Sequence, residues 1–299
     1  MAPGLGGELC SVQRLWRGEW IELLYRADRS VPPRPGWRGG APWLFPAVGR
    51  SFTQRQLAGH EAGEPGSWNL GAKEYPMPIH GFAMTQAWQA SQRPSSILCR
   101  TSSDSSTLRY YPFDYELKAE YFLLPRGLRV AVEVLAGAAN RQAMPFSIGN
   151  HITWALPFAR GGDPGACLVR TPARVERLLS AQSLLTGATR AADYAGGVPL
   201  RDAPRLSDCV LGDFPSGEVW AELIDPASFG IRVSQREIPG VSPKAAPEHF
   251  CFVFYADAQR SFLCTEPWYG GPNSLNERRG LVMLEPGERF GWEMSAEFI

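Results

Sequence analysis

The chain has 299 residues, of which 44% are hydrophobic and 20% charged, with 30 basic and 30 acidic side chains. This length allows one large domain or two ordinary ones. The balanced charge gives no electrostatic reason to expect binding to nucleic acid or to an anionic membrane. The sequence contains no run of about 18 apolar residues, so it predicts no transmembrane helix.

The cysteines and the start of the chain indicate a reducing compartment. The first residues lack a basic stretch followed by an apolar one, which argues against a secretory signal. The six cysteines occur singly, without a CxxC pair, so the signals for zinc and for disulfides are weak. Cys209, Cys251 and Cys264 lie in or near apolar runs, where a thiol is usually a small buried hydrophobe. We expect a cytoplasmic protein.

Two long stretches show no regular pattern. Residues 51–79 are rich in Gly and Glu, and residues 160–206 are rich in Gly, Ala and Arg. Loops of this length in a domain are usually functional rims or poorly ordered insertions. The sequence leaves open whether they close over a binding site. Within the second stretch, residues 172–185 have the only helical rhythm in the chain.

Elsewhere apolar and polar residues alternate, which is typical of antiparallel strands with one wet face. The alternation is clear at residues 115–123, 128–134 and 290–298, and turn signals separate such runs at 124–127, 225–230 and 285–288. Strands with one apolar face must pack on a second sheet. The sequence therefore predicts an all-β fold, a large antiparallel β-sandwich with little helix. No break in the pattern indicates a domain boundary, so we expect a single domain over residues 1–299.

Of the four histidines, His151 is the most informative. It interrupts the apolar stretch "MPFSIGNHITWALPF", where burial disfavours a charged ring and both ring nitrogens need partners. A satisfied core residue, a metal ligand and a proton donor all remain possible roles. His60 lies in a polar loop and is expected to be exposed, and His249 opens a strand, where a structural role is favoured. His80 stands beside Gly81 at a strand entrance, where it could face a cleft or cap a loop.

Glu266 and Arg50 are further candidates. Glu266 ends an apolar β-rich run and is followed by Pro267 and Trp268, a setting in which desolvation raises a carboxyl pKa and suits the group to act as a base. The alternative is a strand-end glutamate paired with an arginine. Arg50 ends "GGAPWLFPAVGR" and could hold hydroxyls or carboxylates, or be a solvated loop residue.

Read together, seven segments resemble the aldose 1-epimerase (galactose mutarotase-like) family, in the order in which that family carries them. They are "GGAPWLFPAVGR", "IHGFA", "YPFDYELKAEYFL", "MPFSIGNHITWALPF", "LSDCVLGD", "CTEPWYGGPNSLN" and "LEPGE". The resemblance covers the chain from about residue 39 onward and is nearest to the glucose-6-phosphate 1-epimerase branch. It implies a β-sandwich fold, in agreement with the alternation.

The resemblance implies an isomerase that interconverts the α and β anomers of a sugar. Glu266 matches the family's general base and His151 its general acid, and acid–base chemistry of this kind needs no metal or organic cofactor. His80, Asp208 and Arg50 match substrate-binding positions. The alignment at Asp208 is the least secure, because Asp213 lies close by.

Trp268 and Asp225 complete the set of candidates. Trp268 is a substrate-binding candidate that could stack on a sugar ring or lie buried under Glu266. Asp225 belongs to the turn at 225–230, so we interpret it as structural.

One departure from the family concerns the substrate. Many relatives on the glucose-6-phosphate branch carry an arginine where this chain has Met84, and its loss weakens the case for a phosphorylated substrate. Arg50, Arg55, Lys73 and Arg109 could still supply positive charge. A neutral hexose, a sugar phosphate and an oligosaccharide end remain open as substrates.

The leading hypothesis is therefore a carbohydrate epimerase of the aldose 1-epimerase or glucose-6-phosphate 1-epimerase type, acting as a monomer or homodimer. The alternative is a non-catalytic carbohydrate-binding or regulatory module on the same fold. A glycoside hydrolase needs two carboxylates across the bond, and here a histidine is expected opposite the glutamate. A cupin-like metal site would need several closely spaced histidines.

Overall fold

The structure is a computed structural model of the chain. It describes residues 1–26, 39–59, 65–215, 218–240, 245–257, 259 and 261–299, and the structural statements below concern these residues. None of the helices in this part of the chain has the length and apolar character needed to cross a membrane.

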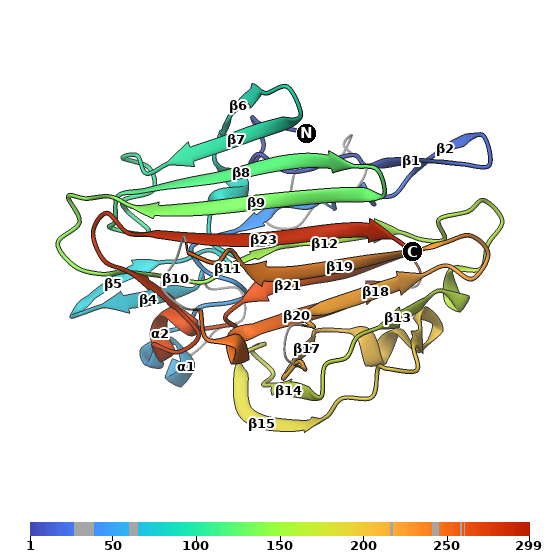
Figure 1. Cartoon of the computed structure of the whole chain (residues 1–299). Helices are drawn as coiled ribbons and strands as arrows, with labels where there is room; N and C mark the ends of the chain where they lie inside the picture. The colour runs from blue at the N-terminus through green and yellow to red at the C-terminus, as the bar shows by residue number, and fades with distance from the viewer. Residues whose placement is uncertain (27–38, 60–64, 216–217, 241–244, 258, 260) are drawn as a thin grey trace.

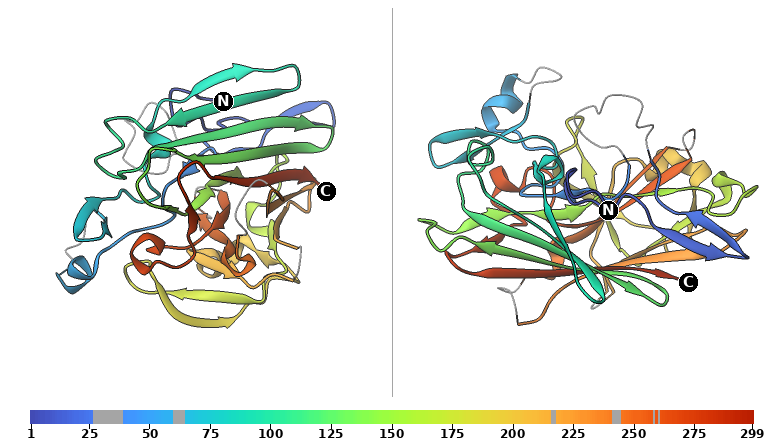
Figure 2. Two further views of the ribbon diagram at one scale, coloured as in Figure 1. Left: turned by 60° about the vertical axis from the view of Figure 1, so that its left-hand side comes forward. Right: turned by 90° about the horizontal axis from the view of Figure 1, so that it is seen from above.

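Most strands belong to two antiparallel sheets, which form the two layers seen in Figures 1 and 2. The first sheet has the order β15–β14–β17–β20–β21–β11–β3, and β12 also pairs with β21. Its strands are β3 (Trp43–Leu44), β11 (Ile148–Asn150), β12 (Ile152–Ala155), β14 (Val175–Leu179), β15 (Leu185–Ala191), β17 (Cys209–Gly212), β20 (Phe250–Asp257) and β21 (Phe262–Tyr269).

The second sheet has the order β16–β13–β18–β19–β23–β9–β8–β7–β6. Its strands are β6 (Gln89–Gln92), β7 (Ser96–Ser102), β8 (Tyr115–Leu124), β9 (Gly127–Ala136), β13 (Leu168–Arg170), β16 (Val198–Pro199), β18 (Trp220–Ile224), β19 (Gly230–Glu237) and β23 (Arg289–Phe298).

Short elements complete the described fold. Three strand pairs lie outside the two sheets: β1 (Gln13–Trp16) with β2 (Glu19–Glu22), β4 (Ser67–Leu70) with β5 (Lys73–Pro76), and β10 (Met144–Phe146) with β22 (Val282–Leu284). The helices are α1 (Gln54–Gly59), α2 (Ser274–Glu277) and four 3-10 turns, η1 (Ala83–Thr85), η2 (Pro164–Ala166), η3 (Leu200–Leu206) and η4 (Pro247–His249).

Large aromatic side chains join the two sheets. Trp43 of β3 contacts Trp292 of β23 with ring centroids 6.2 Å apart, and Tyr269 of β21 contacts Phe290 of β23 at 6.0 Å. These residues belong to one core cluster that draws buried side chains from both layers. The prediction of an all-β antiparallel sandwich with little helix is confirmed. The predicted turns are confirmed too, because residues 124–127, 225–230 and 285–288 each lie where one strand ends and the next begins.

Two predictions about the long stretches are wrong. Residues 172–185 form no helix, because β14 pairs with β15 on one side and β17 on the other. The stretch 160–206 is not irregular, since it holds β13 to β16. In residues 51–79 the described part contains α1 and the β4–β5 hairpin, while residues 60–64 lie outside the described residues. Exposed Gly- and Ala-containing strands such as β15 carry no alternation, so only their pairing reveals them.

Candidate active site

Glu266 lies in the middle of β21, not at the strand end that the sequence predicted. The strand continues through Trp268 and Tyr269 because both still pair with β20. Side chains alternate along a strand, so Glu266 and Trp268 share one face of the sheet. Trp268 packs there in an apolar cluster separate from the core between the sheets. Glu266 therefore projects from the face of the first sheet that is turned away from the second sheet.

His151 is placed opposite Glu266 by strand register. It is the single residue between β11 and β12, and both strands pair with β21 in one continuous register, with Gly149 opposite Trp268 and Ile152 opposite Thr265. His151 Nε2 lies 3.4 Å from Glu266 Oε1, and both side chains are buried. Two residues from distant parts of the sequence thus form one acid–base pair.

Burial determines which protonation states the pair favours. It raises the pKa of the Glu266 carboxyl well above its usual value, and the negative charge of Asp208 raises it further, against the opposing effect of Trp268. Burial also lowers the pKa of His151 well below that of an ordinary histidine. Interacting groups titrate as a pair, and between these two values this pair carries one proton. One partner can then accept a proton while the other donates one.

His80 is held beside this pair by the backbone of Gly49. Its own N–H donates to Gly49 O at 2.8 Å, and its ring Nδ1 accepts from Gly49 N–H at 3.1 Å. The ring centroid lies 5.5 Å from that of His151 and 5.7 Å from that of Trp268. Burial and the charge of Arg50 lower the pKa of His80 to about 4. Near neutral pH the ring is therefore uncharged, and because Nδ1 accepts, Nε2 carries the hydrogen and is a donor.

Arg50 and Asp208 are exposed residues near the same group. Partial burial raises the pKa of Asp208, against the opposing charge of Arg50, and the same charge helps to lower the pKa of His80. The negative charge of Asp208 in turn raises the pKa of Glu266. Asp208 precedes β17 and Asp213 follows it, so the two lie at opposite ends of that strand. The structure thus gathers the six predicted site residues Arg50, His80, His151, Asp208, Glu266 and Trp268 in one neighbourhood, with opposite charges at its exposed side.

Comparisons with known proteins bear on the fold. Residues 62–200 match the family model described as aldose 1-epimerase. A galactose mutarotase related enzyme from Lactobacillus acidophilus superposes with a TM-score of 0.78 at 21% identity, covering 100% of this chain and 93% of that one. This chain has a galactose mutarotase-like fold. Its residues 62–200 carry the family match, and the fold extends along its whole length.

Two further solved structures have the same galactose mutarotase-like fold. A galactose mutarotase-like protein from Lactobacillus casei gives a TM-score of 0.76 at 22% identity, covering 99% of this chain and 95% of that one. A galactose 1-epimerase from Lactobacillus acidophilus gives 0.71 at 15% identity, covering 99% and 89%. A search of curated proteins finds no match.

One neighbour of the pair was not singled out from the sequence. Cys264 lies two residues before Glu266 on β21, so it faces the same side, and its Sγ lies 3.5 Å from Thr153 Oγ1 on β12. A nitrogen of His151, the sulfur of Cys264 and an oxygen of Glu266 all lie within 4.8 Å of one another. Such donors suit zinc, but burial raises the pKa of the Cys264 thiol well above its usual value, so metal binding would require release of that proton. The same alternation that orients Glu266 could have pointed to Cys264.

The remaining candidates have other partners. Asp225 accepts hydrogen bonds from Ala227 N–H and the Ser228 hydroxyl, in agreement with the turn role. His249 lies in η4, just before β20, as the sequence indicated. His60 lies outside the described residues.

Met84 is buried in η1 and belongs to the apolar cluster that contains Trp268 and Val253. The thioether of Met84 is therefore packed among apolar side chains. Among the other cations considered, Arg55 pairs with Glu74 at 2.9 Å, and the charged ends of Lys73 and Arg109 lie over the rings of Tyr75 and Tyr110.

Two cavities lie elsewhere in the molecule. One of about 660 Å³ is lined by Arg177, His249 and residues 270–274. The other, of about 580 Å³, lies between the two sheets. Neither cavity is lined by Glu266 or His151. The acid–base pair is therefore identified by its geometry and charge rather than by the volume of a cavity.

Proposed function

We propose that the protein is a sugar 1-epimerase that interconverts the α and β anomers of a free aldose. The observation that carries this proposal is the buried pair of Glu266 and His151, held 3.4 Å apart on one sheet face in a galactose mutarotase-like fold. A pair that holds one proton can supply both a base and an acid in the same step.

The reaction needs two proton transfers and a bond rotation. Glu266 takes the proton from the anomeric hydroxyl while His151 gives one to the ring oxygen, and the bond between the anomeric carbon and the ring oxygen breaks. The carbonyl then rotates about the bond between C1 and C2. Closure with reversed proton transfers gives the other anomer and restores the pair. This step starts from the form in which the proton of the pair lies on His151 and Glu266 is ionised. The raised pKa of Glu266 makes its carboxylate a strong base, and the lowered pKa of His151 makes its protonated ring a strong acid, so both transfers are favoured.

The other residues hold the sugar. His80 offers its Nε2–H to a hydroxyl, because Gly49 occupies Nδ1. Arg50 and Asp208 supply a donor and an acceptor for further hydroxyls at the exposed side. Trp268 packs against the ring of His80 and keeps it oriented toward His151.

A neutral aldose fits these residues better than an aldose 6-phosphate. A phosphate needs positive charge, but Met84 is packed in an apolar cluster and Arg55 is paired with Glu74. Arg50 remains as a candidate for a phosphate contact, so the 6-phosphates belong in the test as a separate arm.

The test follows the optical rotation of freshly dissolved α-glucose, α-galactose and their 6-phosphates, with anomer-resolved NMR as a second readout. The wild type is expected to accelerate equilibration, and Glu266→Gln and His151→Asn to lose about 10²- to 10⁴-fold of that acceleration. His249→Asn is the matched control and is expected to retain the rate. Sugar binding without acceleration in the wild type would favour a non-catalytic binding module and overturn the proposal.

A further inference from the structure

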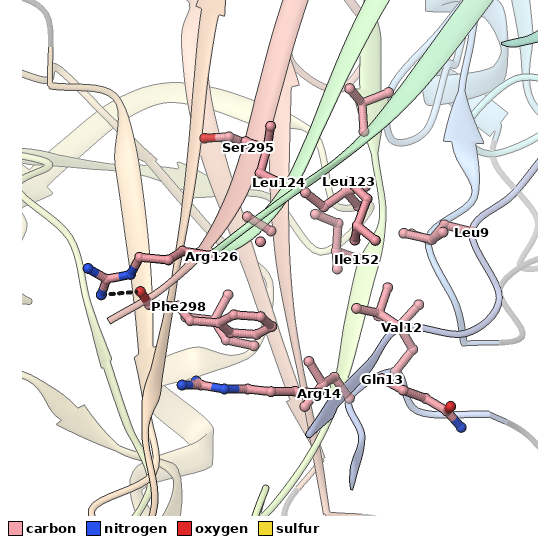
Figure 3. A pocket seen from close by; sticks show the side chains of 18 of the residues that line it. Leu9, Val12, Gln13, Arg14, Leu123, Leu124, Arg126, Ile152, Ser295 and Phe298 are labelled. Carbon is pink, nitrogen blue, oxygen red and sulfur yellow. Dashed lines mark hydrogen bonds between the residues drawn. The ribbon is translucent and has the colours of Figure 1, made fainter. Parts of the chain in front are cut away.

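The cavity of about 580 Å³ lies on the other side of β12 from His151. Ile152 and Trp154 of β12 form part of its wall, and Val130 and Met294 of the second sheet form another part. Leu9 and residues 11–15 line a further part. Figure 3 shows the side chains of Leu9, Val12, Leu123, Leu124 and Ile152 around this space. Cavities of 300 to 1,000 Å³ with apolar walls and a few polar groups are typical of small-molecule sites.

Two arginines lie together at one side of the cavity. Figure 3 shows the guanidinium groups of Arg14 and Arg126 on the same side, to the left of the Phe298 ring. Arg126 donates to Phe298 O at 2.9 Å. Within the described residues neither arginine pairs with a carboxylate. Burial and the charge of Arg126 lower the pKa of Arg14, as expected for two cations held close together.

The Arg14 guanidinium stacks on aromatic rings and keeps N–H donors available for a ligand. Its central carbon lies 4.0 Å from the ring centroid of Phe229 and 4.2 Å from that of Phe298. Stacking of this kind uses the face of the group and leaves its N–H edge available. Arg14 Nη1 is buried and has no hydrogen-bond partner in the described part of the chain. A buried, unpaired cationic donor strongly favours an anion.

A second buried polar atom lines the same cavity. Asn150 is fully buried, and its Nδ2 donates to Ala41 O at 2.9 Å. Its Oδ1 has no partner among the described residues. Buried polar atoms are nearly always hydrogen-bonded, so such an atom on a cavity wall is a mark of a binding site.

We propose that this cavity binds a single-chain anionic amphiphile of the fatty-acid type, with its acyl chain between the sheets and its carboxylate on Arg14 and Arg126. The apolar walls match the acyl chain. The two guanidinium groups, neither of which pairs with a carboxylate within the described residues, match the headgroup. The site is independent of the sugar chemistry, because the wall residues Ile152 and Trp154 point away from the face that carries His151 and Glu266.

The contribution of the acyl chain is tested by calorimetric titration of the whole protein. The ligands are octanoate, decanoate and dodecanoate, each below its critical micelle concentration. The Kd is expected to fall about fourfold for each added methylene until the cavity is full. Decyltrimethylammonium has a similar chain with the opposite charge and is expected to bind at least tenfold more weakly than decanoate. A Kd that does not depend on chain length, or equal binding of the ammonium compound, would overturn the proposal.

Variants of the protein distinguish the contribution of the headgroup to binding from that of the acyl chain. Arg14→Gln and Arg126→Gln are each expected to weaken decanoate binding tenfold or more, and Arg126→Gln serves if Arg14→Gln fails to fold by circular dichroism. Arg17→Gln changes a neighbouring arginine outside the cavity and is expected to leave the Kd unchanged. Ala296→Phe fills the cavity with both arginines intact and is expected to abolish binding. Undiminished binding in Ala296→Phe would place the ligand elsewhere and refute this site.

Discussion

Asn150 and His151 are neighbours in the chain but serve opposite faces of the first sheet. Asn150 lines the cavity between the sheets, whereas His151 meets Glu266 on the face turned away from the second sheet. Successive side chains on an extended backbone point to opposite sides, so one strand forms a wall of both places. A change of strand register by one residue would exchange the faces of Asn150 and His151 and would destroy both the cavity wall and the acid–base pair.

The buried carboxyl of Glu266 is expected to reduce stability at high pH. Its pKa is raised in the folded state, so the folded protein binds more protons than the unfolded chain above pH 4.5, and stability falls as the pH rises through the folded value. Glu266→Gln removes this penalty while keeping the shape of the side chain. Thermal unfolding between pH 5 and 9 should show a Tm advantage of the variant that grows with pH. A constant difference would contradict a raised pKa.

The pH dependence of anomer exchange is expected to be bell-shaped. Activity needs a Glu266–His151 pair that carries one proton. At high pH Glu266 ionises and the pair loses that proton, and at low pH His151 becomes charged and the pair gains a second one. Because the pKa of His151 is lowered, the acid limb should lie well below pH 6.5, and because that of Glu266 is raised, the alkaline limb should lie well above pH 4.5. Measurement of kcat/KM from pH 4 to 10 tests both limbs. An acid limb centred at 6.5 would indicate an ordinary, exposed histidine.

His80 offers a test that separates binding from folding. His80→Asn keeps an acceptor for Gly49 N–H and a residue type that tolerates the positive φ of 65° at this position, but it lacks the Nε2–H donor. We expect its KM to rise about tenfold, with stability within about 1 kcal/mol of the wild type. His80→Ala leaves the Gly49 N–H unpaired as well and should cost a further 1 to 2 kcal/mol, roughly. Equal stability of the two variants in urea unfolding would contradict this role for Nδ1.

Gly81 is expected to be essential for the path of the chain beside His80. It has a φ of +72°, and a Cβ would lie 2.2 Å from Phe45 O. Gly71 is a matched control, because its φ is +59° but nothing lies within 4 Å of a Cβ there. Gly71→Ala should cost about 1 kcal/mol for the backbone conformation alone. Gly81→Ala should cost about 3 kcal/mol or more and reduce anomer exchange. Similar unfolding free energies for the two variants would show that the close approach to Phe45 is unimportant.

The site residues were predictable only as separate positions. Motifs singled out Glu266, His151, His80, Asp208 and Arg50, but their mutual placement depends on pairing between β21 and strands far away in the sequence. Cys264 was interpreted as a buried hydrophobe, and its position beside the pair follows from the same register. Glu266 was expected at a strand end because Pro267 follows it. Pairing with β20 carries the strand past that proline.

The sequence by itself determined the class of fold and the turns. Alternation at residues 115–123, 128–134 and 290–298 is a local property of extended chains with one buried face, and the turn residues act locally as well. Only the tertiary structure decided that residues 172–185 contribute strands, that His151 faces Glu266, and that Arg14 and Arg126 line one cavity. These outcomes depend on contacts between distant segments, which short-range patterns do not encode.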